Sequence, residues 1–584
     1  MSQQFTKAEY DVSKLLGFIE SGYLGLPDLQ RPFVWPNTKV RDLFDSMYSG
    51  YPVGHLLFWD ERRDGLQKSI GEDKKQKSPS LLILDGQQRL TSLYAVMKGK
   101  RVLRSNYKTE SITIAFNPLT EVFKVADAST AKNKFFVNDI SLFFTDPKGN
   151  HKFIEKFFSD LKQYRTLSEE QEIIISNALG NLWALNSYMF TSLELVPDID
   201  EEAAAEIFVR VNSKGTVLKQ ADFILTLMSV HWNDGRMQLE EFCKNATKPG
   251  KVASSYNHFI EPSPDQMLRV VVGYGFKRAR LKYVYQILKG KNLETGEITV
   301  ENRNRQFYIL TEAQKKAINL QDWQDYLRCI ANAGFRNRSM ISSPNTLLYC
   351  YTLYLIGKWD HSVDHFVLQR VIAQWFFMAS ITMRYTSSAE SQFDQDLSSL
   401  PENKDPNGFV QTLQDACNME LGPDFWNKKV PNELKSVKSM SPAFCAYQAA
   451  LVLHNAKAFF SDNKVEKLLD PALIAKRAAT EKHHLFPKEY LKTIGIDEKK
   501  HINQVANLAM TVWDDNMKIL DTNPRIYLPD LAKRFDEKAL ENISYWHALP
   551  DKWETMNYFE FLEARGKKIA QVIKDAYNEH LFHK

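Results

Sequence analysis

Side chains that can transfer protons and hold a metal ion gather in residues 481–520, EKHHLFPKEYLKTIGIDEKKHINQVANLAMTVWDDNMKIL. His483 and His484 are adjacent and precede Leu-Phe-Pro, while Asn507 lies in an apolar run and Asn516 follows nine residues later. A neutral imidazole, with a pKa of about 6.5, accepts a proton at cellular pH or binds a metal, and an amide holds its neighbours by hydrogen bonds. Two adjacent histidines alone are common as ordinary surface or core residues, so the interpretation depends on the whole combination.

The combination HHxFP, followed by two asparagines with the strand-like ANLAMTV between, resembles an HNH nuclease. In such ββα-metal sites an imidazole activates water, and a metal polarises the scissile phosphate and stabilises the leaving oxygen. The resemblance implies that His484 is the general base, that Asn507 orients it, and that His483 and Asn516 are the metal ligands. His501 and Asn503 lie in the same loop but match no catalytic position.

The ligand types do not decide which metal ion is bound. Many nucleases of this kind carry a carboxylate where this chain has His483. An imidazole and an amide bring no negative charge, so Mg²⁺ is less favoured relative to Mn²⁺ or another transition metal. Cys445 is the last cysteine of the chain, so packing, and not a structural zinc, must hold this region together.

A second polar group lies at a junction near the start of the chain. The apolar run at 81–84 favours a strand, Asp85-Gly86 signals a turn, and apolar residues then recur at helical spacing: Leu90, Leu93, Tyr94 and Met97. The first turn of a helix exposes backbone N–H groups and the positive end of the dipole, which suits an anion such as phosphate. Arg89 adds a bidentate charged fork, and Gln87 and Gln88 add amides.

A purely structural interpretation of the junction is also available. Asp85 can cap the helix, Gly86 can allow the turn, and the two amides can be solvated. No GxxxxGK[ST] or GxGxxG pattern is present, so a nucleotide site here would be of another type.

Two further blocks accompany the junction. LPDLQRPFVWP, residues 26–36, contains Gln30 and Arg31, and AEIFVRVNSKGTVLKQADFILTLM, residues 205–228, contains Arg210 and Asn212. Together with DGQQRLTSL these blocks resemble the N-terminal domain of the GmrSD family of modification-dependent (type IV) restriction endonucleases, which has a ParB/sulfiredoxin-like fold. The closing stretch at 553–573, with Trp553 and Arg565, resembles the last helix of the same family. We interpret that stretch as an amphipathic support helix.

The GmrSD resemblance implies a domain that binds and hydrolyses a nucleoside triphosphate. Its site would comprise Asp85, Gly86, Gln87, Gln88 and Arg89, with Gln30 and Arg31 close by. Arg210 and Asn212 match the second motif of the family. A structural explanation for those two is equally good, because Gly215 looks like a helix C-cap and Asn212 can satisfy the chain end.

These sites need elements to position them, and the chain predicts a multidomain α+β fold. Strand-like runs at 55–59, 81–84 and 112–116 alternate with helical patterns in the first region, and a lysine-rich loop is expected at 71–80. We expect a ParB-like nucleotide-binding sensor domain at 1–235, a buried helical connector at 236–430 and an HNH nuclease domain at 431–584. The last would be helical with a ββα-metal core.

Composition agrees with a globular protein. The chain has 584 residues, of which 44% are hydrophobic, and its net charge of +4 permits a nucleic-acid partner without requiring one. No apolar run approaches the length of a membrane helix and no signal-peptide core is present, so we expect a cytoplasmic protein without a membrane partner. A homo-oligomer is left open.

A basic aromatic segment lies between Asp265 and Glu294, where no acidic residue occurs. Its cations are Arg269, Lys277, Arg278, Arg280, Lys282, Lys289 and Lys291, and they alternate with Tyr and Phe. Such a segment could follow a phosphate backbone. It could equally be helical, with a buried aromatic face and a solvated basic face.

The two resemblances together imply a metal-dependent endonuclease, controlled by a nucleoside triphosphate, that cuts modified double-stranded DNA, such as phage DNA, in an antiviral restriction system. Two alternatives stay open. The first is a nucleotide-controlled DNA-binding regulator whose HNH-like module has no turnover. The second is a nuclease directed at RNA, since HNH chemistry acts on a phosphodiester regardless of the base.

Overall fold

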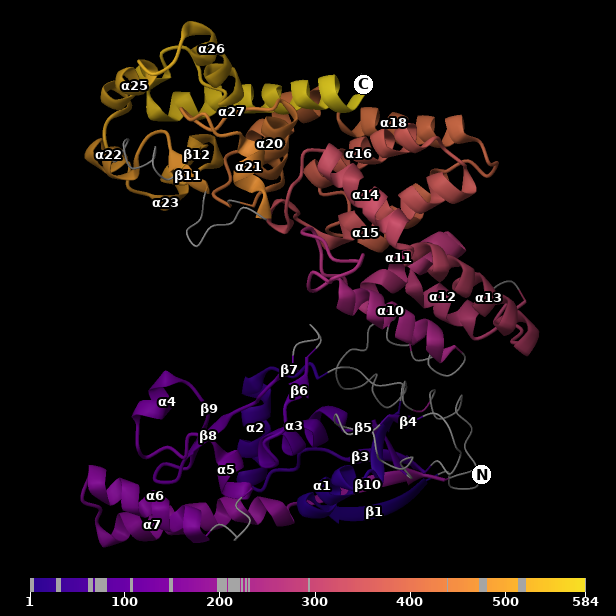
Figure 1. The fold of residues 1–584 in the computed structure, drawn as a ribbon, viewed down its shortest axis with the longest axis vertical. Helices are drawn as coiled ribbons and strands as arrows, with labels where there is room; N and C mark the ends of the chain where they lie inside the picture. Colours follow the sequence, from indigo (N-terminus) through magenta and orange to yellow (C-terminus); the bar gives the residue numbers. More distant parts are fainter. Residues whose placement is uncertain are drawn as a thin grey trace. The chain divides into compact units, whose positions relative to one another are not determined.

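The computed structural model describes residues 5–27, 33–60, 67–68, 81–104, 109–145, 151–196, 207, 221, 224–225, 228, 232–292, 295–438, 440–471, 480–512 and 521–582. The chain forms two compact units, Met1–Met237 and Gln238–Lys584, drawn together in Figure 1. The division falls within helix α10 (Asn233–Asn245).

A mixed six-stranded sheet forms the centre of the first unit, in the order β1-β10-β3-β5-β2-β4. Its strands are β1 (Phe5–Asp11), β10 (Met189–Leu195), β3 (Leu56–Asp60), β5 (Leu81–Asp85), β2 (Leu24–Pro27) and β4 (Gln67–Lys68). The pairs β10–β3 and β2–β5 are parallel, and the pairs β1–β10, β3–β5 and β2–β4 are antiparallel. A register shift between Leu57 and Phe58 places Leu57 opposite Asp85, at the end of β5.

Short strands and helices complete the first unit. The strands are β6 (Val102–Leu103), β7 (Thr109–Glu110), β8 (Ile114–Asn117) and β9 (Val122–Val125). The helices are α1 (Val12–Glu20), α2 (Asn37–Tyr48), α3 (Gln87–Met97), α4 (Ala128–Lys132), α5 (Ile140–Phe144), α6 (His151–Tyr164), α7 (Glu169–Ala184) and the 3₁₀ turn η1 (Leu185–Ser187).

The predicted strand, turn and helix around residue 86 are confirmed. Strand β5 ends at Asp85, Gly86 adopts a left-handed φ of 100°, and α3 begins at Gln87. Leu90, Leu93 and Met97 are buried in the apolar core of the unit, as their spacing predicts. The core therefore fixes the direction in which α3 leaves the sheet.

The first part of the second unit is helical, as expected for 236–430. Its elements are α11 (Pro264–Phe276), α12 (Leu281–Leu288), α13 (Val300–Ala317), α14 (Leu320–Asn332), η2 (Arg338–Met340), α15 (Pro344–Leu355), the π-helix η3 (Ile356–Asp360), α16 (His365–Ile381), α17 (Ala389–Ser399), α18 (Pro406–Glu420), the π-helix η4 (Phe425–Lys429) and α19 (Val430–Glu433). Residues 345–355 of α15 are nearly all buried, because this helix is apolar on every side.

The basic aromatic segment forms α11 and α12. Among the residues that the structure describes, Arg269 pairs with Glu390, Lys277 with Asp360 and Arg280 with Asp394, all inside the unit. The same helix α11 buries Met267, Val271 and Tyr274. These pairs neutralise part of the charge, so the segment presents less positive charge than its sequence indicates, and DNA contact there stays a prediction.

The remainder of the second unit surrounds a small hairpin. Its elements are α20 (Pro442–Leu453), α21 (Val465–Leu469), β11 (Thr480–His484), α22 (Lys488–Thr493), α23 (Lys499–Ile502), η6 (Val505–Asn507), β12 (Leu508–Val512), α25 (Pro524–Ala532), α26 (Glu537–Trp546), η7 (Trp553–Thr555), α27 (Tyr558–Ala576) and the π-helix η8 (Tyr577–Phe582). In Figure 1, β11 and β12 lie among α22, α23 and α21. A separate apolar cluster, with Phe486 and Phe561 among its members, supports the hairpin.

The multidomain α+β class is confirmed. The ParB-like fold, the ββα-metal core and the division into three domains stay predictions, and the expected loop at 71–80 lies outside the described residues. Among the helices of the described ranges, none has both the length and the apolar character needed to cross a membrane.

Candidate functional site

The two predicted histidines lie at the end of β11, paired antiparallel with β12. His483 is opposite Ala509, and His484 is opposite Leu508. Successive residues of a strand point to opposite faces. His483 is 5% exposed, and its ring lies against Phe459 and Tyr527 with centroid distances of 6.3 and 6.2 Å. His484 is half-buried on the other face.

His484 is held by an amide that the sequence analysis did not select. Its Nε2 lies 3.0 Å from Oδ1 of Asn503, at the end of α23. An amide oxygen only accepts hydrogen bonds, so Nε2 carries the proton and Nδ1 of the neutral ring keeps its lone pair. Asn503 was missed because it matches no position of the HNH pattern. The only signal was its place in the same loop.

The electrostatic environment keeps the His484 imidazole neutral. Burial lowers the pKa of His484, the hydrogen bond to Asn503 opposes this shift, and the nearby charge of Lys488 lowers the pKa further. A neutral ring with a fixed tautomer can accept a proton at Nδ1. His484 therefore has the state that a general base needs at neutral pH.

Asn507 is fully buried and bonds to backbone rather than to the imidazole. Its Oδ1 accepts from the N–H of Phe486 at 2.9 Å, and its Nδ2 donates to the carbonyls of Phe486 and Ile502 at 3.1 Å each. Its own carbonyl accepts from the N–H of Leu485 at 2.8 Å. Asn507 thus fixes the chain immediately after His484, and any effect on the base is transmitted through that backbone.

Arg565 of α27 supports the β11–β12 hairpin. The sequence alone assigned this residue only to a support helix. Its guanidinium is fully buried and donates to the carbonyls of Ala506, Leu508 and His547 at 2.6, 2.9 and 3.0 Å. Burial lowers the pKa of this group. A sequence signal existed, because Arg565 lies on the apolar stripe of α27 with Leu562 and Ile569.

The predicted metal ligands are only partly described. Asn516 lies outside the described residues, so its position relative to His484 is not defined. His483 offers an imidazole next in sequence to the base, but it points to the opposite face of β11 and packs against aromatic rings. The structure therefore does not bring His483 and His484 together on one face.

At the nucleotide candidate, Arg89 is bound by the protein itself. Its guanidinium donates to the carbonyls of Val53 and His55 at 2.8 and 2.7 Å and pairs with Asp85 at 3.0 Å. Burial lowers the pKa of Arg89, and Asp85 opposes this shift. The loop can approach so closely because residue 54 is glycine: a Cβ there would lie 2.4 Å from Nη1 of Arg89.

Gln88 connects the junction to the first motif block. Its Oε1 accepts from the N–H groups of Val34 and Trp35 at 2.9 and 3.3 Å. Gln87 is half-buried at the first position of α3. Gln30, Arg31, Arg210 and Asn212 lie outside the described residues.

The junction has a different cap from the one that the structural interpretation expected. Gly86 is the N-cap residue, so the N-cap position provides no capping side chain. Asp85 pairs with Arg89 instead.

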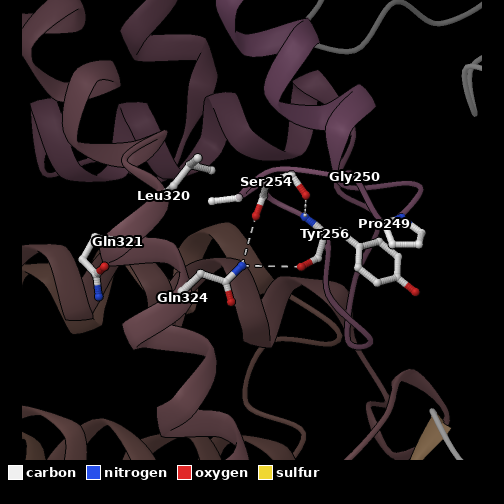
Figure 2. Close-up of a pocket in the computed structure, with 8 residues that line it drawn as sticks. Pro249, Gly250, Ser254, Tyr256, Leu320, Gln321 and Gln324 are labelled. Atoms are coloured by element: carbon white, nitrogen blue, oxygen red, sulfur yellow. Dashed lines mark hydrogen bonds between the residues drawn. The ribbon is translucent and has the colours of Figure 1, made fainter.

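A surface pocket in the second unit contains none of these residues. It measures about 320 Å³ and is formed by the loop before α11 together with α14. Figure 2 shows Nε2 of Gln324 bonded to the carbonyls of Ser254 and Tyr256 beside it. The lining combines apolar side chains, such as Leu320, with the amides of Gln321 and Gln324 and the hydroxyl groups of Ser254 and Tyr256.

Comparison with known proteins bears on the first unit. Residues 12–229 match the family model described as GmrSD restriction endonuclease, N-terminal domain. This part of the chain is therefore similar to the N-terminal domain of the GmrSD restriction endonucleases. The chain is also similar to the uncharacterized protein MJ0686 of Methanocaldococcus jannaschii, with 21% identity over 566 residues that cover 91% of this chain and 89% of that protein.

We expect Arg89→Met to destabilise the first unit by about 2–3 kcal/mol, because two charge-assisted hydrogen bonds are lost and Asp85 loses its partner. Arg101→Met is the matched control: Arg101 is exposed and makes one bond, to the carbonyl of Thr109, so its loss should cost about 0.5 kcal/mol or less. Thermal unfolding of both variants measures the difference. Equal melting temperatures would show that the loop at 53–55 does not depend on Arg89.

Proposed function

We propose that the protein is a metal-dependent endonuclease that cuts modified double-stranded DNA, phage DNA above all, under the control of a nucleoside triphosphate. The β11–β12 hairpin would perform the hydrolysis, and the turn at Asp85 to Arg89 would bind the nucleotide. The match of residues 12–229 to the GmrSD N-terminal domain supports the restriction role. The geometry of His484 supports the chemistry.

The observation that carries this proposal is the hydrogen bond between Nε2 of His484 and Oδ1 of Asn503. It leaves Nδ1 as the proton acceptor, and burial keeps the ring neutral. His484 would take a proton from water as the oxygen attacks the phosphorus of the scissile phosphodiester. Asn507 and Arg565 would act as positioning residues, because they fix the backbone on both strands beside the base.

A divalent metal, when bound, would supply charge stabilisation for the leaving oxygen. Its proposed ligands are His483, through an imidazole nitrogen, and Asn516. The His483 ring packs against Phe459 and Tyr527, and this packing does not orient the ring as a metal ligand. The ligand role of His483 is therefore a separate part of the proposal with its own test.

The nucleotide part of the proposal rests on the first turn of α3. The N-cap residue is Gly86, which has no side chain to accept from the N–H groups of the first turn. Such groups suit phosphate oxygens. Arg89 is tied to the loop at 53–55, so it would contribute by holding this turn in shape.

His484→Ala should abolish cleavage, with a rate loss on the order of 100-fold or more from removal of the base. Nucleotide binding should be unchanged, because the turn at 85–89 belongs to the other unit. The assay is nicking of modified and unmodified plasmid with divalent metal and each nucleoside triphosphate. His501→Ala, two residues from Asn503 in sequence, is the matched control and should cut at the normal rate.

A His484→Ala protein that cleaves normally would refute the assignment of the base. A wild-type protein that binds modified DNA but never nicks it would favour the nucleotide-controlled regulator. Preferential cutting of RNA would favour the RNA-directed alternative.

The pH profile of cleavage should have its acid limb below pH 6.5, because the base is active when neutral and its pKa is lowered. Lys488→Met removes a charge that lowers this pKa, so the limb should move to higher pH. Asn503→Ala removes a bond that raises it, so the limb should move to lower pH while the maximal rate falls. Identical limbs in all three proteins would exclude His484 as the titrating group.

His483→Phe keeps an aromatic ring between Phe459 and Tyr527 but removes the nitrogen ligand. If His483 binds the metal, this variant should melt near the wild-type temperature and lose metal-dependent cleavage. Cleavage rates measured over a range of Mn²⁺ and Mg²⁺ concentrations provide the readout. Normal rates at normal metal concentrations would show that His483 is a core residue only.

A further inference from the structure

Three potential metal ligands meet where the C-terminus returns to α20, on elements that the nuclease proposal does not use. His454 follows α20, and Glu579 and His580 lie in η8, the π-helix that continues α27. One ligand atom from each side chain lies within 4.8 Å of the others. Figure 1 shows α27 running past α20 to the C-terminus.

The tautomer of His454 is set by the backbone. Its Nε2 lies 3.3 Å from the carbonyl oxygen of Val572, and a carbonyl only accepts hydrogen bonds. Nε2 therefore carries the proton, and Nδ1 presents its lone pair toward His580. Histidines that ligate metals are oriented in this way, with the second ring nitrogen donating to a carbonyl or carboxylate.

The spacing of the two ring nitrogens is compatible with a shared metal ion. Nδ1 of His454 and Nε2 of His580 are 3.4 Å apart. With Zn–N bonds of about 2.0–2.1 Å, two nitrogens at corners of a tetrahedron lie about 3.4 Å apart. The planes of the two rings are nearly perpendicular, at 80°.

Glu579 completes the set. Its Oε2 lies 3.9 Å from Nε2 of His580, and its side chain is 62% exposed, so a change of rotamer can bring the carboxylate closer. Two imidazoles and a carboxylate are ligands typical of Zn²⁺. Because the carboxylate is exposed, a fourth position would be open to solvent.

We propose that His454, Glu579 and His580 form a binding site for Zn²⁺ or a similar transition-metal ion, which fastens η8 to the end of α20. The site is independent of the hairpin. The same C-terminal turn is already held by Gln374 of α16, whose Nε2 donates to the carbonyl of Leu581 at 2.5 Å. The metal would add a second attachment, at the residues next to Leu581 in sequence, to a different helix.

The test uses the full-length chain freed of metal with a chelator and titrated with Co²⁺, which reports tetrahedral coordination by its visible absorption. We expect a saturable signal that excess Zn²⁺ removes. His580→Ala should weaken Co²⁺ binding by more than about 100-fold, since loss of an outer-shell partner alone costs 10–100-fold. Glu579→Gln should weaken binding by less, because the two imidazoles remain.

Two controls separate this site from others. His365→Ala removes an exposed histidine whose described contacts are with Gln369 and Phe366, and it should bind Co²⁺ normally. His483→Phe removes the proposed ligand of the nuclease site, and it should also keep the signal. Zn²⁺ should raise the melting temperature of the wild type and not of His580→Ala, as expected for a ligand that binds the folded state.

A Co²⁺ signal that survives His580→Ala, or that is lost in His483→Phe alone, would overturn the proposal. So would the absence of saturable binding by a wild-type protein with a normal circular dichroism spectrum. None of these results bears on DNA cleavage, so failure here is distinguishable from failure of the nuclease proposal.

Discussion

The hairpin depends on one buried charge, the guanidinium of Arg565. Removing such a group from water is costly, and the cost is offset only when the donors are satisfied. Here the hydrogen bonds go to the carbonyls of Ala506, Leu508 and His547, each worth on the order of 1.5–3 kcal/mol as a bond to a charged group. A helix near the C-terminus is thereby joined to the residues on both sides of Asn507. The start of β12 is fixed by a group 57 residues away in sequence.

The proposed base, His484, is positioned by this arrangement. A two-stranded hairpin is marginal by itself, so β11 and β12 need external support. Tyr527 of α25 donates to the carbonyl of Leu485 at 2.6 Å, and Tyr558 of α27 donates to the carbonyl of His501 at 2.9 Å. His484 and Asn503 are thus held by chain segments that are themselves bonded to the C-terminal helices. A catalytic group needs such rigid support, because small displacements reduce proton transfer steeply.

Local features of this fold could be predicted from the sequence, and long-range contacts could not. The strand, turn and helix around Gly86 follow from apolar spacing and one glycine, and the strand-like run after Asn507 becomes β12. Asn503 and Arg565 were missed because their partners lie 19 and 57–59 residues away, beyond any periodic pattern. Arg89 is the opposite case, because the sequence indicated a role that its contacts do not favour. Its residue type and position suit a phosphate, but its guanidinium already donates to the carbonyls of Val53 and His55. Only the folded chain reveals which donors are already used.

The occupied state of Arg89 also constrains how a nucleotide could act on the first unit. A phosphate that bound the Arg89 guanidinium would remove the hydrogen-bond donor of two backbone carbonyls and leave Asp85 without its partner. The loss of these contacts would offset much of the binding free energy. A phosphate bound by the first N–H groups of α3 would leave these contacts intact. It would instead add order to a turn that already joins the loop at 53–55 to the segment at Val34 and Trp35 through Gln88. A ligand changes the balance between two states of a protein only if it binds one of them more tightly. A phosphate at this turn would favour the state in which both segments are ordered.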